Sequence, residues 1–159
     1  MSGLALWPYA LQVYGRPGVE GTLLELQDAH GQCVPYLLWA LWLAAEGRAA
    51  DDDDLTRAAE LARAWQDAAV APLRGLRRGL KSPSSKAPAR AWSTLREGVK
   101  ALELDAERML LEMLEAASPA SGDAPNDSLA MVRRAVGAWG RPAPDGLLDH
   151  LAAVAASAA

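Results

Sequence analysis

The sequence predicts an all-α protein: a helical bundle with a buried central helix and a long antiparallel helical hairpin. Three observations indicate this. The 159 residues are 51% hydrophobic but poor in β-branched side chains, which favours helix over sheet. Residues 33–45 form an uncharged apolar run. Two long segments, about 55–80 and 89–117, repeat apolar residues every three or four positions.

The first two predicted helices are short. Residues 4–14 place apolar side chains at helical spacing, and Gly15 and Pro17 then interrupt the pattern. A second helix is expected to begin at Pro17 and to bury Val19, Leu23, Leu24 and Leu26 on one side. Each of these two helices is therefore predicted to pack against the rest of the protein through one face only.

The central helix is predicted over about residues 34–46. A helix that is apolar on every face is normally buried in a bundle, and this run is shorter than the roughly 20 residues that cross a membrane. Pro35 suits the first helical turn, and Gly47 suits the end of the helix. Trp39 and Trp42 are expected to be buried, with a partner for each indole N–H.

The turn before the central helix contains the single cysteine, Cys33, three residues after His30. This spacing is compatible with half a metal site or a Cys–His nucleophile, but zinc needs three or four ligands, and His150 lies far away in sequence. We expect no metal and no cofactor, with Gln27 and Asp28 bonding backbone groups at the turn. A small-molecule or metal site at Gln27, Asp28, His30 and Cys33 is kept as an alternative.

The hairpin is predicted from two long segments. The four aspartates Asp51 to Asp54 favour an N-terminal cap for the first over a cation site. Pro72 is expected to kink or divide that helix, and residues 82–88 form a loop. The second helix, about 89–117, carries a predicted heptad seam: Trp92, Leu95, Val99, Leu102, Ala106, Met109 and Met113. A second stripe is expected to face the core: Leu104, Leu111 and Leu114.

The chain is divided into a helical bundle domain over residues 1–117, a flexible linker over 118–128 and a tail over 129–159. The linker is low in apolar residues. The tail is expected to be short helical or partly disordered, because its two candidate helices have modest apolar stripes. The start of the sequence suggests neither a signal peptide nor a membrane anchor, and a single cysteine is consistent with a cytoplasmic protein.

Charge is distributed unevenly along the chain. Residues 71–102 hold eight basic residues and one acidic residue, whereas residues 1–70 hold four and ten, and residues 103–159 hold four and nine. The hairpin is expected to bring the eight together at its loop end as a basic patch. These residues are Arg74, Arg77, Arg78, Lys81, Lys86, Arg90, Arg96 and Lys100.

The basic patch suggests a non-enzymatic helical interaction module that binds an acidic protein partner. Nucleic acid or another anion is the alternative ligand, although only Trp92 interleaves with the bases and no helix-turn-helix reader is recognisable. A solvated face, neutralised by Asp51 to Asp54 or by the acidic residues between Glu103 and Glu115, is the competing account. The sequence shows no glycine-rich phosphate loop, Glu-x-x-His pair or Ser/His/Asp arrangement, so we expect no enzyme and no membrane partner. Oligomeric state is not indicated.

Four blocks of sequence, in order, resemble the TIGR02444 family of uncharacterised proteobacterial proteins of about this length. They are LELQDAHG, LLWALWLA, VAPLRGLRRGLK and REGVKALELDAERMLLE. The resemblance covers about residues 6–115 and implies no activity. Family members typically carry a Val-Asn pair before the apolar helix, where this chain has Val34-Pro35. That difference removes an amide side chain from any site at this position.

Overall fold

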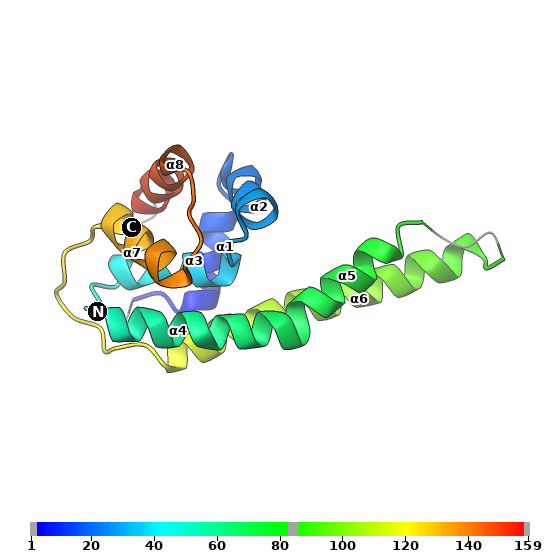
Figure 1. The fold of residues 1–159 in the computed structure, drawn as a ribbon, viewed down its shortest axis with the longest axis horizontal. Helices are drawn as coiled ribbons and strands as arrows, with labels where there is room; N and C mark the ends of the chain where they lie inside the picture. The colour runs from blue at the N-terminus through cyan, green and yellow to red at the C-terminus, as the bar shows by residue number, and fades with distance from the viewer. Residues whose placement is uncertain (1–2, 83–85, 158–159) are drawn as a thin grey trace.

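The computed structural model of the chain describes residues 3–82 and 86–157, and these form helices with no strand. The predicted all-α class is confirmed. In Figure 1, α1, α2, α3, α7 and α8 form a body, and a hairpin of α4, η1, α5 and α6 extends away from it. The bounds are α1 (Leu6–Tyr14), α2 (Val19–His30), α3 (Val34–Ala45), α4 (Asp52–Trp65), the π-helical turn η1 (Gln66–Val70), α5 (Ala71–Gly79), α6 (Ala89–Ala116), α7 (Ser128–Trp139) and α8 (Asp145–Ala156).

The predicted central helix is confirmed as α3. It contacts α1, α2, α4, α6, α7 and α8, which surround it. Pro35 lies in its first turn, and Gly47 takes the left-handed backbone conformation just past its end, at φ +60°. Trp39 and Trp42 are 2% and 1% exposed, so the apolar run forms the middle of the core.

The buried aromatic side chains of α3 all find hydrogen-bond partners. Trp39 Nε1 donates to Ser118 Oγ, and Trp42 Nε1 donates to the Leu4 carbonyl, each at 2.7 Å. The Tyr36 hydroxyl donates to the carbonyl of Leu55 at 2.9 Å. These bonds offset the cost of removing polar groups from water, and they connect α3 to segments before, after and beside it.

The predicted tail, residues 129–159, contains most of α7 and all of α8, and these short helices share the core. Val132 and Ala135 on α7 and Leu151 on α8 are fully buried. Because α7 faces α3 with small residues, it comes close enough for Trp139 to lie 5.5 Å from the Tyr36 ring. Residues 118–127, the expected flexible linker, have no helix but contact the end of α3, where the Ala124 N–H donates to the Gly47 carbonyl. Their order in solution stays a prediction.

The first arm of the hairpin begins at the four aspartates, as predicted. Asp51 Oδ1 accepts a hydrogen bond from the Asp54 N–H at 2.7 Å, and the Asp54 carboxylate accepts one from the Asp51 N–H at 3.1 Å. This reciprocal capping box satisfies backbone donors that have no partner inside the helix. The aspartate run therefore fixes where α4 begins.

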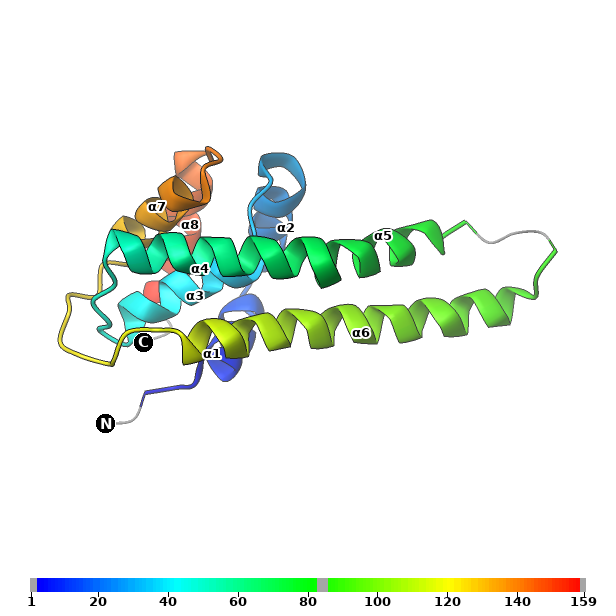
Figure 2. The ribbon, with the colours of Figure 1, turned by 60° about the horizontal axis from the view of Figure 1, so that its bottom comes forward.

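A π-helical turn lies where Pro72 was expected to kink or divide the arm. Proline has no N–H, and its ring would clash with the carbonyl four residues earlier in a regular α-helix. Here the chain widens over Gln66–Val70 before Pro72, and the Ala71 N–H donates to the Gln66 carbonyl five residues back. Figure 2 shows that α4 and α5 nevertheless run on as one arm beside α6.

The predicted seam of α6 is confirmed at Val99 and Ala106, which are buried, and wrong at Leu95, Leu102 and Met109, which are between 50% and 55% exposed. The buried side chains of α6 are Val99, Glu103, Ala106, Leu110, Leu111 and Leu114. In the second predicted stripe, Leu111 and Leu114 are buried but Leu104 is 52% exposed. The observed seam differs from the predicted one because Glu103 is buried where the apolar pattern predicted its neighbour, Leu102.

Candidate functional site

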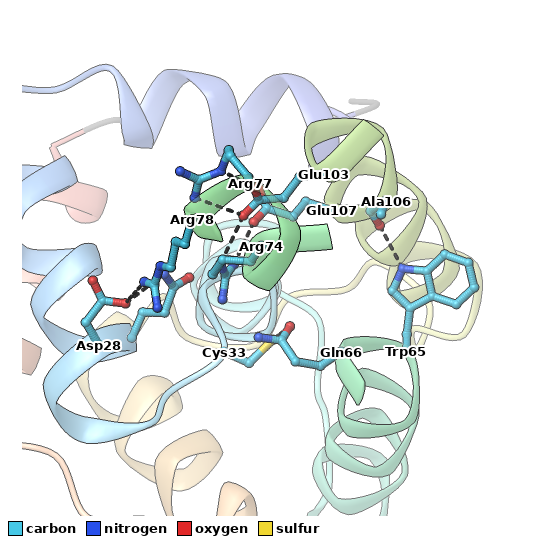
Figure 3. A network of polar contacts seen from close by, with 11 residues as sticks. Asp28, Cys33, Trp65, Gln66, Arg74, Arg77, Arg78, Glu103, Ala106 and Glu107 are labelled. Carbon is cyan, nitrogen blue, oxygen red and sulfur yellow. Dashed lines mark hydrogen bonds and ion pairs between the residues drawn. The ribbon is translucent and has the colours of Figure 1, made fainter. Parts of the chain in front are cut away.

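The two arms of the hairpin are joined by an ionic cluster of Arg74, Arg77, Glu103 and Glu107 (Figure 3). Arg74 Nε donates to Glu103 Oε1 at 2.9 Å, and its Nη2 donates to Glu107 Oε1 at 3.0 Å. Arg77 Nε donates to the other oxygen of Glu103 at 2.5 Å. The arginines are three residues apart on α5 and the glutamates four apart on α6, so each pair shares a helical face.

The ionic cluster is largely buried. The side chain of Glu103 is 8% exposed, and those of Arg74 and Arg77 are 12% and 22% exposed. A carboxylate so removed from water persists only where donors surround it, and three guanidinium nitrogens donate to Glu103. The cluster therefore replaces apolar packing at this level of the seam.

The two glutamates of the cluster differ in acidity. Burial alone would raise the pKa of Glu103, but hydrogen bonds from Arg77 and Arg74 outweigh it and hold that pKa below its usual range. For Glu107, burial dominates, and with the nearby charge of Glu103 it raises the pKa despite the opposing effect of Arg74. Glu103 is thus the fixed anion of the cluster, and Glu107 is the group that takes up a proton first.

The eight predicted patch residues fall into two sets. Arg74 and Arg77 belong to the ionic cluster, Arg78 pairs with Asp28 at 3.1 Å, and Arg96 lies 3.6 Å from Glu97. Arg74 and Arg77 are therefore neutralised by acidic residues of α6, as the alternative to a binding patch predicted. The other four are exposed: Lys81, Lys86, Arg90 and Lys100.

We name residues 76–82 and 86–102 the hairpin end. Within the described part of the chain, Lys81, Arg90 and Lys100 form no salt bridge. The same segment exposes three leucines by 52% to 55%, namely Leu76, Leu95 and Leu102. Its one aromatic residue, Trp92, is half-buried. The hairpin end thus presents bases and leucines together, with no aromatic face for stacking.

The turn between α2 and α3 holds the residues of the alternative metal or nucleophile site, and its cysteine is buried. Cys33 is 1% exposed, its Sγ lies 3.5 Å from Gln66 Oε1, and burial raises the pKa of its thiol to about 12. Asp28 bonds Gln27 and Arg78 rather than backbone groups, so that expectation was wrong. Across residues 3–82 and 86–157, no three His, Cys, Asp or Glu side chains are grouped to hold a metal.

The structure also contains an apolar groove of about 580 Å³ between α1, α2 and the hairpin. Four exposed apolar side chains line it: Leu11, Tyr14, Leu24 and Leu104. Its polar lining mixes both signs of charge and includes the ionic cluster and Lys100. Exposed apolar residues of the first two helices gather at this groove, and among them is Leu24, which was expected to be buried but is 42% exposed.

Comparison with known proteins gives a family but no activity. A family model described as "Protein of unknown function (DUF2390)" matches residues 5–114. No curated protein matches the chain, and no solved structure matches it. The matched range holds α1 to α5 and almost all of α6, so it includes the whole hairpin end and the ionic cluster. In the described residues, no helix is both long and apolar enough to cross a membrane.

Proposed function

Because the chain belongs to the DUF2390 family, whose function is unknown, we propose its role from the site itself. We propose a non-enzymatic interaction module whose hairpin end binds an acidic protein partner. One observation carries this proposal: the hairpin end exposes leucines beside basic residues that form no salt bridge within the described chain. The body supplies the stability, and the hairpin end supplies the surface.

The spacing of the exposed leucines favours a helical partner. Leu95 and Leu102 are seven residues apart, as are Leu102 and Met109, so these side chains follow one stripe along α6. A seven-residue apolar repeat is the pattern that a second helix matches when it packs along the first. Exposed apolar residues in a continuous stripe are uncommon on a surface without a binding role.

The charge around the stripe favours an acidic partner. Residues 76–102 hold seven basic residues and one acidic residue, and α5 and α6 place them around the hairpin end. An amphipathic helix with acidic flanks would gain apolar contact with the leucines and charge complementarity with Lys81, Arg90 and Lys100. A nucleic acid would pair with the basic residues but would leave the leucines exposed, because protein surfaces that bind nucleic acid are mainly polar and basic.

The test uses defined probes. A fluorescein-labelled peptide helix with leucine every seventh residue and glutamate flanks is titrated with the full chain, beside a scrambled peptide of the same composition and a DNA duplex. We expect the helical peptide to bind at least about tenfold more tightly than the scrambled peptide. We also expect its affinity to fall with added salt, because exposed charges are screened.

Charge-matched variants locate the site. K81E/R90E/K100E is expected to lose about tenfold or more in affinity for the peptide. R57E/R108E/R133E changes net charge equally at exposed positions outside the hairpin end and is expected to keep it. Equal losses in both variants, or preferential binding of the duplex, would contradict the acidic protein partner. Loss with L11N/L24N, but not with L95N/L102N, would place the partner in the apolar groove instead.

The narrower assignments have their own support. The four sequence blocks support membership of the proteobacterial family that they resemble. A single cysteine, buried at 1% exposure, is consistent with the reducing cytoplasm that we propose as the compartment. In this proposal the module works without a cofactor and catalyses no reaction.

A further inference from the structure

A second cleft lies where the α2–α3 turn, the π-helical turn, α5 and the end of α7 meet. Its volume is about 670 Å³. Four arginines, three glutamines and two aspartates line it, so it is polar where the apolar groove is not. Its arginines come from three separate segments: Arg63 on α4, Arg74 and Arg78 on α5, and Arg141 just after α7.

Arg63 is held in the cleft by groups other than carboxylates. Its Nη2 donates to the carbonyl of Trp139 at 2.7 Å, and its guanidinium carbon lies 4.7 Å from the centre of the Trp139 ring. Among the described residues it forms no salt bridge. These contacts fix the direction of the side chain without neutralising its charge.

The exposed side chain of Arg141 lies against Gly31. A Cβ atom on Gly31 would lie 2.4 Å from Arg141 Nη1, and Gly31 has a left-handed φ of +62° that favours glycine. Gln32 Nε2 donates to the Arg141 carbonyl at 2.9 Å, which holds the backbone as well. Arg141 also has no salt bridge in the described part of the chain. The cleft thus contains two exposed guanidiniums without carboxylate partners, of which that of Arg63 is held by Trp139.

The other charged side chains of the cleft nearly balance. Arg74 and Arg78 already pair with Glu103 and Asp28, while Asp67 is the remaining acidic residue. Arg63 and Arg141 together therefore leave the cleft positive. Beside them, the Oε1 atom of Gln32 is buried and accepts no hydrogen bond from the described residues.

We propose that this cleft binds a small phosphate monoester with a hydroxyl-bearing organic part. A guanidinium donates two parallel hydrogen bonds to a phosphate, and Arg63, already held by Trp139, loses little freedom on binding. The volume lies within the usual range for small-molecule sites and exceeds what a phosphate alone fills. The glutamine amides, Gln27, Gln32 and Gln66, supply donors and acceptors for hydroxyl groups.

The ligand class is tested by calorimetry on the full chain with four probes: glycerol 3-phosphate, inorganic phosphate, glycerol and succinate. We expect saturable binding of glycerol 3-phosphate, weaker binding of inorganic phosphate and none of glycerol. Affinity for succinate equal to that for glycerol 3-phosphate would overturn the phosphate class in favour of a general anion site. Absence of saturable binding by any probe would overturn the site.

Variants test the geometry. Arg63→Gln and Arg141→Gln are each expected to weaken glycerol 3-phosphate binding about tenfold, whereas Arg133→Gln, an exposed arginine outside the cleft, is not. Gly31→Ala should also weaken binding, because it displaces Arg141. Gly18→Ala introduces comparable backbone strain at φ +82° outside the cleft, with His150 Nε2 at 3.4 Å from its Cβ, and is expected to bind normally.

The controls keep this site separate from the hairpin end. K81E/R90E/K100E should leave the affinity for glycerol 3-phosphate unchanged. A failure of the cleft proposal can therefore be distinguished from a failure of the hairpin-end proposal. Far-ultraviolet circular dichroism confirms that each variant is folded. Equal weakening by Arg133→Gln and Arg141→Gln would show a general charge effect and overturn the proposed cleft.

Discussion

Around α3, aromatic side chains fill the interior and bond to chain segments on every side, whereas the arms of the hairpin meet through ion pairs. Trp39 and Trp42 are almost fully buried. In the hairpin end, by contrast, Leu95 and Leu102 are more than half exposed, while Arg77 and Glu103 occupy the seam. The body buries apolar surface, and the hairpin end keeps it accessible.

This difference indicates where the free energy of unfolding resides. Burial of apolar area is the dominant favourable term in folding, and most of that burial surrounds α3. An ion pair in the seam holds the arms in register but gains little net free energy, since both charges lose hydration. The hairpin end is therefore expected to open locally at lower cost than the body.

The largest expected effect breaks the body. Trp39→Ala or Trp42→Ala should lower the free energy of unfolding by about 3–5 kcal/mol, because each leaves a large cavity and an unpaired acceptor. Urea denaturation followed by circular dichroism measures this loss. A loss below about 1 kcal/mol at both positions would contradict the central role of α3.

Trp92→Ala is the matched change in the hairpin end. Trp92 is half-buried, so we expect its removal to cost less than about 2 kcal/mol. The ratio of the two losses in unfolding free energy shows how much more the body contributes to stability than the hairpin end. If Trp92→Ala costs as much as Trp42→Ala, the hairpin end is part of the cooperative core.

The next effect concerns the ionic cluster. Glu103→Gln should cost about 2–3 kcal/mol, because it leaves Arg74 and Arg77 with less compensation in a mostly buried position. Glu107→Gln should cost less than about 0.5 kcal/mol, since burial disfavours its charged form. Hydrogen exchange should show the loss in α5 and the outer part of α6 before α3.

The pH dependence of these variants has a defined sign. The pKa of Glu103 is lowered on folding, so its contribution is present above the usual value of 4.5 and is lost as pH falls through the lower folded value. The pKa of Glu107 is raised, so its ionised form costs stability, and that cost disappears as pH falls through the higher folded value. Carboxyl NMR should show Glu107 protonating before Glu103. The reverse order would contradict the cluster geometry.

The smallest effect concerns the start of the first arm. Asp51→Ala should cost about 1 kcal/mol, because the Asp54 N–H loses its acceptor. Asp53→Ala removes a charge of the same sign from the same run and should cost only a few tenths of a kcal/mol. Chemical denaturation of both variants separates capping from general charge, and equal losses would contradict the capping box.

The sequence was sufficient for the elements whose signals are local. An uncharged apolar run over residues 33–45, with Pro35 near its start and Gly47 just past its end, predicts a buried helix. Four aspartates before a periodic segment predict a cap. The hairpin follows from two long periodic segments joined by a short loop. Each of these signals lies within the segment it describes, so no knowledge of neighbouring elements was needed.

The buried residues of the hairpin seam could not be predicted from the apolar pattern of one helix alone. An apolar repeat at 95, 102 and 109 is indistinguishable from a seam unless the opposing arm is known. Glu103 entered the seam because Arg74 and Arg77 lie across from it, nearly thirty residues earlier in the chain. The second cleft could not be predicted from the sequence either, because Gly31, Arg63 and Arg141 meet only through the packing of α7.

The π-helical turn at Gln66–Val70 sets the rotational phase between the two halves of the first arm. Each residue advances an α-helix by about 100° and a π-helix by less, so winding the same residues as a regular α-helix would turn all of α5 around its axis. Arg74 and Arg77 would then leave the side that faces Glu103, and the hairpin end would rotate relative to the body. The wider winding of this short segment therefore keeps the two arginines opposite their glutamate partners.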